Sequence, residues 1–193
     1  MLSRIKAVIG VISALCLVLW PFIIAYGLYV DKLGLTLGVL AAISLLRVFT
    51  LPHNKGSLRP LLIISALIAL GLCVLSLVLR GSNLFMYYPV AVNVLFLGVF
   101  ALSLLQGPPI IERLARLTEP DLPPYAIKYV RKVTIAWCVF FILNGTLAWL
   151  TVWWGNLKWW TLYNGGIAYL LMGVMFAGEY LLRLKMRRHY EHA

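Results

Sequence analysis

Acidic residues are scarce in this sequence. Only six Asp and Glu residues occur among 193, against seventeen Lys and Arg residues. All charged residues together make up 12% of the chain, whereas a soluble domain has about 25%. The scarcity also leaves no pair of acids on one predicted helix face for acid–base catalysis. The composition therefore argues against an ordinary soluble enzyme or a soluble binding domain.

Cysteine and histidine are equally few, and neither type is spaced for metal binding. The three cysteines, Cys16, Cys73 and Cys138, lie inside apolar segments, where a thiol is expected to pack rather than to form a disulfide. The three histidines fall in predicted links or in the C-terminal tail. The P-loop, nucleophile-elbow and zinc-protease motifs are absent as well. We predict no cofactor and no metal, and an enzyme is the less favoured class.

Long apolar runs dominate what is present. Hydrophobic residues make up 63% of the chain, and a helix needs about 20 apolar residues to cross a bilayer. The runs predict an all-α membrane protein with a six-helix transmembrane bundle, in a single domain over residues 1–193. The predicted spans are residues 7–30, 33–49, 61–79, 84–105, 133–154 and 160–182.

The first predicted span resembles a secretion signal but is expected to remain in place. Arg4 and Lys6 precede an apolar run from Ala7 to Val30, which is too long for a signal-peptide core and lacks a small-residue cleavage site. Pro21 lies inside this run and predicts a kink, because proline removes a backbone donor.

The basic residues are distributed unevenly over the predicted links. Fourteen of the seventeen lie in the N-terminus, the second and fourth links or the tail, and the other three are Lys32, Arg80 and Lys158. By the positive-inside rule, both termini are expected in the cytoplasm of a bacterial inner membrane. The aromatic residues expected at the opposite interface are Trp149, Trp153, Trp154, Trp159, Trp160 and Tyr163.

The net charge of +11 predicts contact with lipid headgroups rather than with nucleic acid. The basic residues do not form one face or run. They lie at helix ends, where cations meet anionic headgroups. We therefore expect the lipid bilayer as the first partner, with anionic lipid or other envelope membrane proteins as further partners, and no nucleic acid.

The predicted cytoplasmic loop, residues 106–132, has an internal pattern. Two prolines end the fourth span, and Ile110, Ile111, Leu114 and Leu117 then share one helical face, which predicts a short amphipathic helix in the headgroup plane. One interpretation is a plain connector whose cations fix the orientation. The other is a platform for a headgroup or a partner protein, because Arg binds phosphate bidentately. The candidate contacts are Glu112, Arg113, Arg116, Arg131 and Lys132.

Polar residues inside the predicted spans form the second candidate set. Asn93, Asn144 and Asn164 are expected either to hydrogen-bond between helices or to line a polar cavity. Glu179 is the acid inside a predicted span and precedes Arg183 by four residues. This spacing predicts an ion pair, with a proton-relay or headgroup role as the alternative.

A resemblance to a known family begins at the fifth span. The pattern from Lys132 through Ala136, Trp137 and the run Val139–Leu143 to Gly145 resembles the corresponding helix of the bacterial intracellular septation protein A family. Upstream, Pro109, Ile111, Glu112 and Arg113 resemble that family's Pro-Leu-Ile-Gln-Arg string. The chain departs from the pattern at Thr134 and Asn144, so a neighbouring uncharacterised inner-membrane family is the alternative.

The resemblance implies a small inner-membrane protein for cell-envelope upkeep or division, without established catalytic residues. It singles out Arg113, Trp137, Phe140 and Phe141, although helix packing alone explains the three aromatic residues. We therefore expect a non-enzymatic protein that acts through partner or lipid contacts. The alternatives are a small transporter or flippase for a lipid or lipid-linked product and, with least support, a lipid-modifying enzyme with Glu112 or Glu179 as base.

Overall fold

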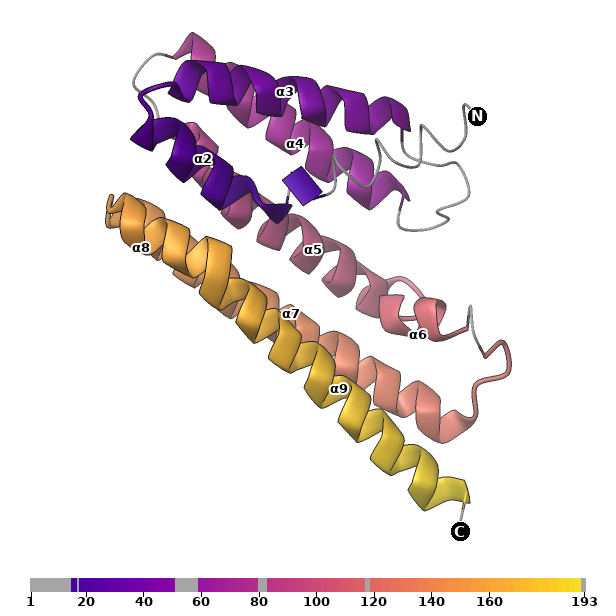
Figure 1. The fold of residues 1–193 in the computed structure, drawn as a ribbon. Helices are drawn as coiled ribbons and strands as arrows, with labels where there is room; N and C mark the ends of the chain where they lie inside the picture. The colour runs from indigo at the N-terminus through magenta and orange to yellow at the C-terminus, as the bar shows by residue number, and fades with distance from the viewer. Residues whose placement is uncertain (1–14, 17, 51–58, 80–82, 117–118, 192–193) are drawn as a thin grey trace, which may run out of the picture.

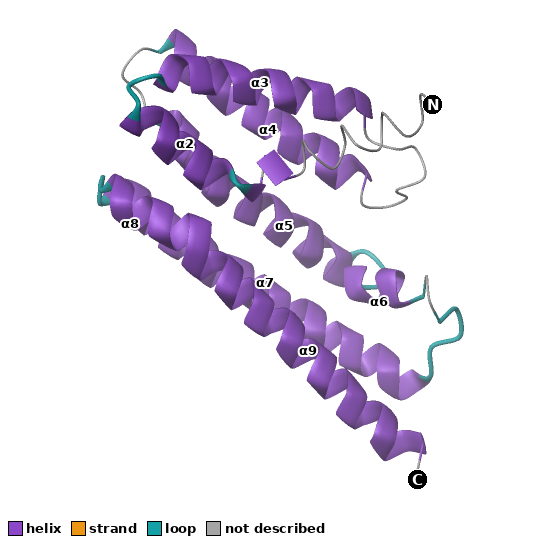
Figure 2. Ribbon diagram, viewed as in Figure 1, coloured by secondary structure: helices purple, strands orange, loops and turns teal. Residues whose placement is uncertain are grey.

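The computed structural model describes residues 15–16, 18–50, 59–79, 83–116 and 119–191, and every regular element in these ranges is helical (Figures 1 and 2). Figure 1 shows α2, α3 and α4 on one side of the bundle, α7 and α9 on the other, and α5 between them. The helices are α2 (Trp20–Tyr29), α3 (Leu33–Thr50), α4 (Arg59–Val78), the 3₁₀ turn η2 (Leu84–Tyr87), α5 (Tyr88–Leu105), α6 (Ile110–Ala115), α7 (Pro124–Trp153), α8 (Leu157–Leu162), the π-helical turn η3 (Tyr163–Ile167) and α9 (Ala168–Glu191).

The apolar helices are compatible with a bilayer. Among the described residues, three continuous helical segments are long and apolar enough to cross one: Leu84–Leu105, Pro124–Trp153 and Leu157–Leu184. Shorter apolar stretches occupy Leu33–Phe49 and Leu62–Val78. The predicted all-α fold is confirmed, and these segments fit the predicted multi-pass membrane protein. The count of six spans stays a prediction, because the first predicted span lies partly outside the described residues.

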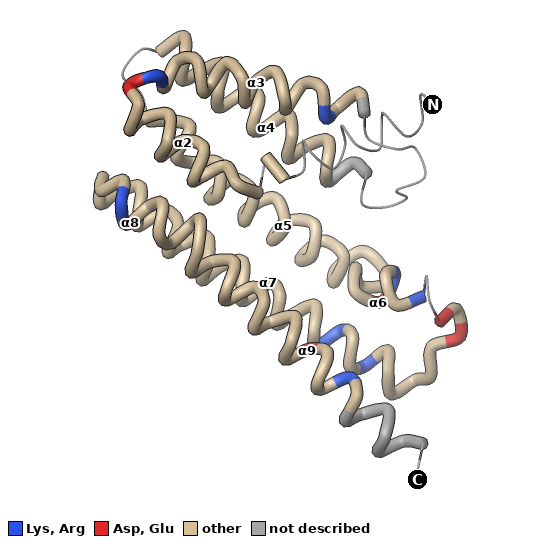
Figure 3. The backbone as a smooth tube through the Cα atoms, viewed as in Figure 1, with Lys and Arg blue, Asp and Glu red and all other residues tan. Residues whose placement is uncertain are grey.

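Charged residues gather at the two ends of the bundle, as the sequence predicts (Figure 3). Lys32 and Lys158 lie at the end formed by the α2–α3 and α7–α8 connections. Blue segments also gather at the opposite end, where α6 and the C-terminus lie (Figure 3). The cations that the element bounds place there are Arg47 in the last turn of α3, Arg113 and Arg116 at α6, Lys128, Arg131 and Lys132 in the first turns of α7, and Arg183 of α9. The apolar band between the two ends is the part of the bundle that fits a hydrocarbon core.

Two tryptophans join the N-terminal helices to the C-terminal hairpin through η2. Trp20 Nε1 donates to the Phe85 carbonyl at 3.2 Å, and Trp160 Nε1 donates to the Met86 carbonyl at 3.0 Å. Trp20 also stacks on Tyr88 with ring centroids 4.4 Å apart. Because irregular backbone inside a membrane must find hydrogen-bond partners in the protein, these indoles hold the 3₁₀ turn in place.

The structure adds detail to the sequence predictions at three places. Pro21 does not kink a continuous helix, because Leu19 forms a turn and the proline lies in the first turn of α2. Helix α7 begins at Pro124, so the last part of the predicted loop 106–132 is helical and runs straight into the predicted fifth span. Trp160 and Tyr163, two of the aromatic residues expected at the interface, are buried within the protein, and the Trp160 indole hydrogen-bonds to η2.

The anchoring role of Trp160 is testable. Trp160→Phe removes the donor to Met86 and leaves a small void, so we expect the free energy of unfolding to fall by about 2 kcal/mol. Reversible unfolding by SDS in mixed micelles measures this quantity. Trp159→Phe is the matched control, because Trp159 is 52% exposed. Equal stability losses in the two variants would contradict the assignment.

Candidate functional site

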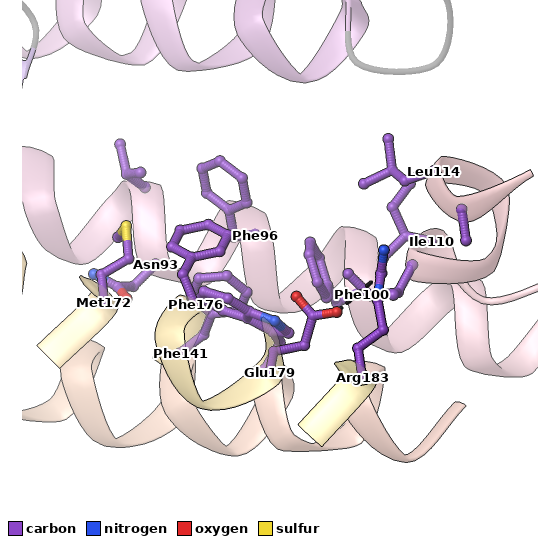
Figure 4. Close-up of a pocket in the computed structure, with 14 residues that line it drawn as sticks. Asn93, Phe96, Phe100, Ile110, Leu114, Phe141, Met172, Phe176, Glu179 and Arg183 are labelled. Carbon is purple, nitrogen blue, oxygen red and sulfur yellow. Dashed lines mark ion pairs between the residues drawn. The ribbon is translucent and has the colours of Figure 1, made fainter. Parts of the chain in front are cut away.

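A cavity of about 510 Å³ lies among α5, α6, α7 and α9 (Figure 4). The side chains along most of its length are apolar, and the cavity is partly open to the surroundings. Polar groups mark its two ends. Asn93 of α5 lies beside Met172 of α9 at one end, while Glu179 and Arg183 of α9 lie at the other (Figure 4). The cavity is therefore amphipathic along its length.

Aromatic packing forms the floor and one wall of this cavity. Trp137 and Phe141 project from α7, and Phe141 meets Phe96 and Phe100 of α5 at centroid distances of 5.3 and 5.2 Å. On the other side, Trp137 contacts Phe176 of α9 at 4.7 Å. Trp137, Phe140 and Phe141 are all buried, as predicted for packing residues. Two of the three also line the cavity.

The short helix α6 closes the cavity at the end where Glu179 and Arg183 lie. The Ser103 hydroxyl accepts the Ile110 N–H at 2.9 Å and donates to the Phe100 carbonyl at 2.7 Å. This double contact folds α6 back against the end of α5. Ile110, Ile111 and Leu114 then line the cavity. The predicted apolar face thus faces protein side chains within the bundle.

Glu112 is placed differently from the prediction. The sequence puts it away from the apolar face, but its exposed fraction is 6%. Arg116 explains the burial, because it binds Glu112 Oε1 through Nε at 3.0 Å and through a terminal nitrogen at 2.8 Å. The other terminal nitrogen of Arg116 donates to the Pro120 carbonyl at 2.9 Å. The predicted i,i+4 pair is confirmed, and Arg116 is engaged within the protein.

The structure does not bring the predicted cationic residues into one site. Arg113 is exposed and donates from Nε to the Pro108 carbonyl at 2.8 Å. Arg131 and Lys132 are exposed on α7 and lie outside the cavity lining. Arg183 is the cation among the described residues that line the cavity. From the sequence we expect only an ion pair with Glu179 for this residue. A basic residue close to the end of a span was the available signal.

A buried polar chain starts at the other end of the cavity. Asn93 Nδ2 donates to the Pro89 carbonyl at 2.8 Å, and Asn93 Oδ1 accepts from Asn144 Nδ2 at 3.0 Å. Asn144 Oδ1 in turn accepts from the Tyr163 hydroxyl at 2.9 Å. The chain links α5, α7 and η3, so interhelical hydrogen bonding is confirmed for Asn93 and Asn144. Asn93 also faces the cavity.

Asn164 belongs to a neighbouring contact rather than to this chain. Its Nδ2 donates to Thr151 Oγ1 at 3.1 Å and to the Trp160 carbonyl at 2.9 Å. Both Tyr163 and Asn164 begin the π-helical turn η3. A π-helical turn inserts an extra residue into the helix and leaves backbone groups to be satisfied elsewhere. The Trp160 carbonyl accepts from the Tyr163 N–H, and the Asn164 side chain adds a second donor to it.

This site has neither a metal-binding cluster among the described residues nor a match to a known protein family. Within the described ranges, no cluster of three His, Cys, Asp or Glu side chains is placed to hold a metal ion. Cys16, Cys73 and Cys138 are free thiols. Comparison of the chain with protein-family models, with curated proteins and with solved structures finds no match. The resemblance to the septation family therefore stays a prediction.

The polar chain gives a stability prediction. Asn144→Leu leaves Asn93 Oδ1 and the Tyr163 hydroxyl without their partner, so we expect a loss of about 1–3 kcal/mol in the free energy of unfolding. In the double variant with Asn93→Leu, the losses are expected to be less than additive by about 0.6 kcal/mol or more. SDS unfolding in mixed micelles measures the cycle. Strict additivity would contradict a direct Asn93–Asn144 bond.

Proposed function

We propose that this chain is a non-enzymatic inner-membrane protein that binds one lipid-like amphiphile in the cavity among α5, α6, α7 and α9. The observation that carries the proposal is the cavity itself. Its volume of about 510 Å³ lies within the usual range for small-molecule sites. Its apolar length and charged end suit an acyl chain with a polar headgroup. We refer to it as the α5–α9 groove.

The position of the α5–α9 groove in the bundle supports this proposal. Arg183 and Met172 lie near its opposite ends. At 1.5 Å per helical residue they are about 16 Å apart along α9, close to half of a ~30 Å hydrocarbon core. We propose that the basic end of the bundle and both termini face the cytoplasm, as the positive-inside rule predicts. The charged end of the groove then lies at headgroup depth in the cytoplasmic leaflet.

A link to cell-envelope upkeep or division rests on the resemblance over Pro109–Gly145. That stretch contributes α6 and the aromatic floor of the groove, with Trp137 and Phe141 in the lining. Binding of an envelope lipid or of a lipid-bearing partner protein would connect the groove to such a role. The proposal thus places the resembling residues at the lipid contact.

A transporter or flippase for a lipid-linked product is the second candidate. The observation that favours it is the buried Asn93–Asn144–Tyr163 chain, which continues beyond the uncharged end of the groove. A polar route past that end is what movement of a headgroup across the bilayer would need. A lipid-modifying enzyme has less support, because Glu112 and Glu179 are both held by arginines.

A groove-filling substitution tests the proposed binding. Met172→Trp places a large ring in the uncharged end of the groove, so we expect loss of the lipid that otherwise stays bound through purification. Native mass spectrometry of the full chain, released from detergent, measures the bound mass. Val174→Trp is the control, because Val174 is 63% exposed and lies outside the lining. Unchanged lipid retention in Met172→Trp would refute binding in the groove.

A further inference from the structure

The charged end of the α5–α9 groove presents one positive and one negative side chain. Arg183 and Glu179 form an ion pair with 2.9 Å between a guanidinium nitrogen and Oε1. Their side chains are 40% and 19% exposed, and Figure 4 shows both at the same end of the cavity. Glu179 Oε1 is buried, and it is the oxygen that meets the Arg183 guanidinium. The Glu179 side chain lines the groove, and a carboxylate has lone pairs beyond the one that meets Arg183.

One further contact holds the Glu179–Arg183 pair in place without changing its charge. The Tyr129 hydroxyl donates to the backbone carbonyl of Glu179 at 3.0 Å, which ties this turn of α9 to α7. Among the described residues lining the groove, Glu179 and Arg183 are the charged ones. The lining therefore has no net charge, although the surrounding end of the bundle is basic.

Charge complementarity identifies the headgroup that fits. A phosphate suits Arg183, because the guanidinium binds phosphate bidentately. A primary ammonium suits Glu179, because its N–H groups can donate hydrogen bonds to the carboxylate. A quaternary ammonium has no N–H to donate, and a headgroup with phosphate alone leaves Glu179 facing a like charge.

We infer that the α5–α9 groove selects a zwitterionic phospholipid with a primary ammonium, placing its phosphate at Arg183 and its ammonium at Glu179. The inference rests on the proposed lipid binding and names the class of lipid. The apolar floor at Trp137 and Phe141 then holds an acyl chain. A lipid of this kind has no net charge, and neither has the lining of the groove.

The test compares three lipids with identical acyl chains and different headgroups: phosphoethanolamine, phosphocholine and phosphoglycerol. The full chain in detergent is titrated with each lipid, and native mass spectrometry gives the dissociation constants. We expect the phosphoethanolamine lipid to bind about tenfold tighter than each of the other two lipids. The reason is that one hydrogen bond to a charged group contributes at least about 1.4 kcal/mol. This comparison uses the unaltered chain and needs no variant to fold.

Two variants test whether Glu179 and Arg183 cause the preference for the phosphoethanolamine lipid. Glu179→Gln is expected to abolish the preference over the phosphocholine lipid, and Arg183→Gln is expected to weaken binding of all three lipids. Asp121→Asn and Lys128→Gln are the controls, because both residues are exposed at the same end of the bundle. They are expected to leave the preference unchanged.

The outcomes separate this inference from the proposed function. Equal binding of the three lipids, or tighter binding of the phosphoglycerol lipid, overturns the inference if Met172→Trp still blocks binding. The inference is also overturned if Glu179→Gln retains the preference for the phosphoethanolamine lipid. If Met172→Trp blocks the binding of none of the three lipids, the proposed function itself is refuted. A preference that Glu179→Gln removes and Asp121→Asn retains supports both.

Discussion

The packing of α5 against α7 is the contact on which the rest of the structure depends. In a membrane, apolar side chains gain little from helix association, so close approach and interhelical hydrogen bonds must hold the helices together. Gly145 permits the approach, because a Cβ at that position would lie 3.0 Å from the Cβ of Asn93. The Asn93–Asn144 hydrogen bond lies beside this glycine, and the rings of Phe96, Phe100 and Phe141 continue the contact toward α6.

The α5–α9 groove follows from how α9 joins this pair. The helix is attached at η3, where Tyr163 bonds to Asn144, and further along through Trp137–Phe176 and Tyr129–Glu179. These three attachments run to α7 and leave the space toward α5 and α6 unfilled. An unfilled apolar cavity of this size costs packing energy in a protein interior. A lipid chain in the groove would restore those contacts, which connects the helix packing to the proposed binding.

The sequence predicts the coarse features because they depend on local properties. Run length and charge distribution along the chain are enough to predict apolar helices and two differently charged ends, and i,i+4 spacing is enough for Glu112–Arg116 and Glu179–Arg183. Burial of Trp160 was missed, because it depends on the η2 turn, which is distant along the chain. Burial of Glu112 was missed, because this residue lies outside the apolar face of its helix. The groove was missed for the same reason. Its lining comes from four helices, and hydrophobic periodicity does not show which apolar residues leave a gap between them.

Photo-crosslinking from the floor of the groove tests the central claim most directly. Benzoylphenylalanine is incorporated at the position of Phe141, which is 6% exposed, and cells are irradiated before purification. The account predicts a covalent lipid adduct, identified by the mass of the labelled peptide. Incorporation at Leu143, an exposed position on the same helix, reports the bulk lipid for comparison. Crosslinks from position 141 that join α5 or α9 peptides and carry no lipid would show a closed interior and contradict the account.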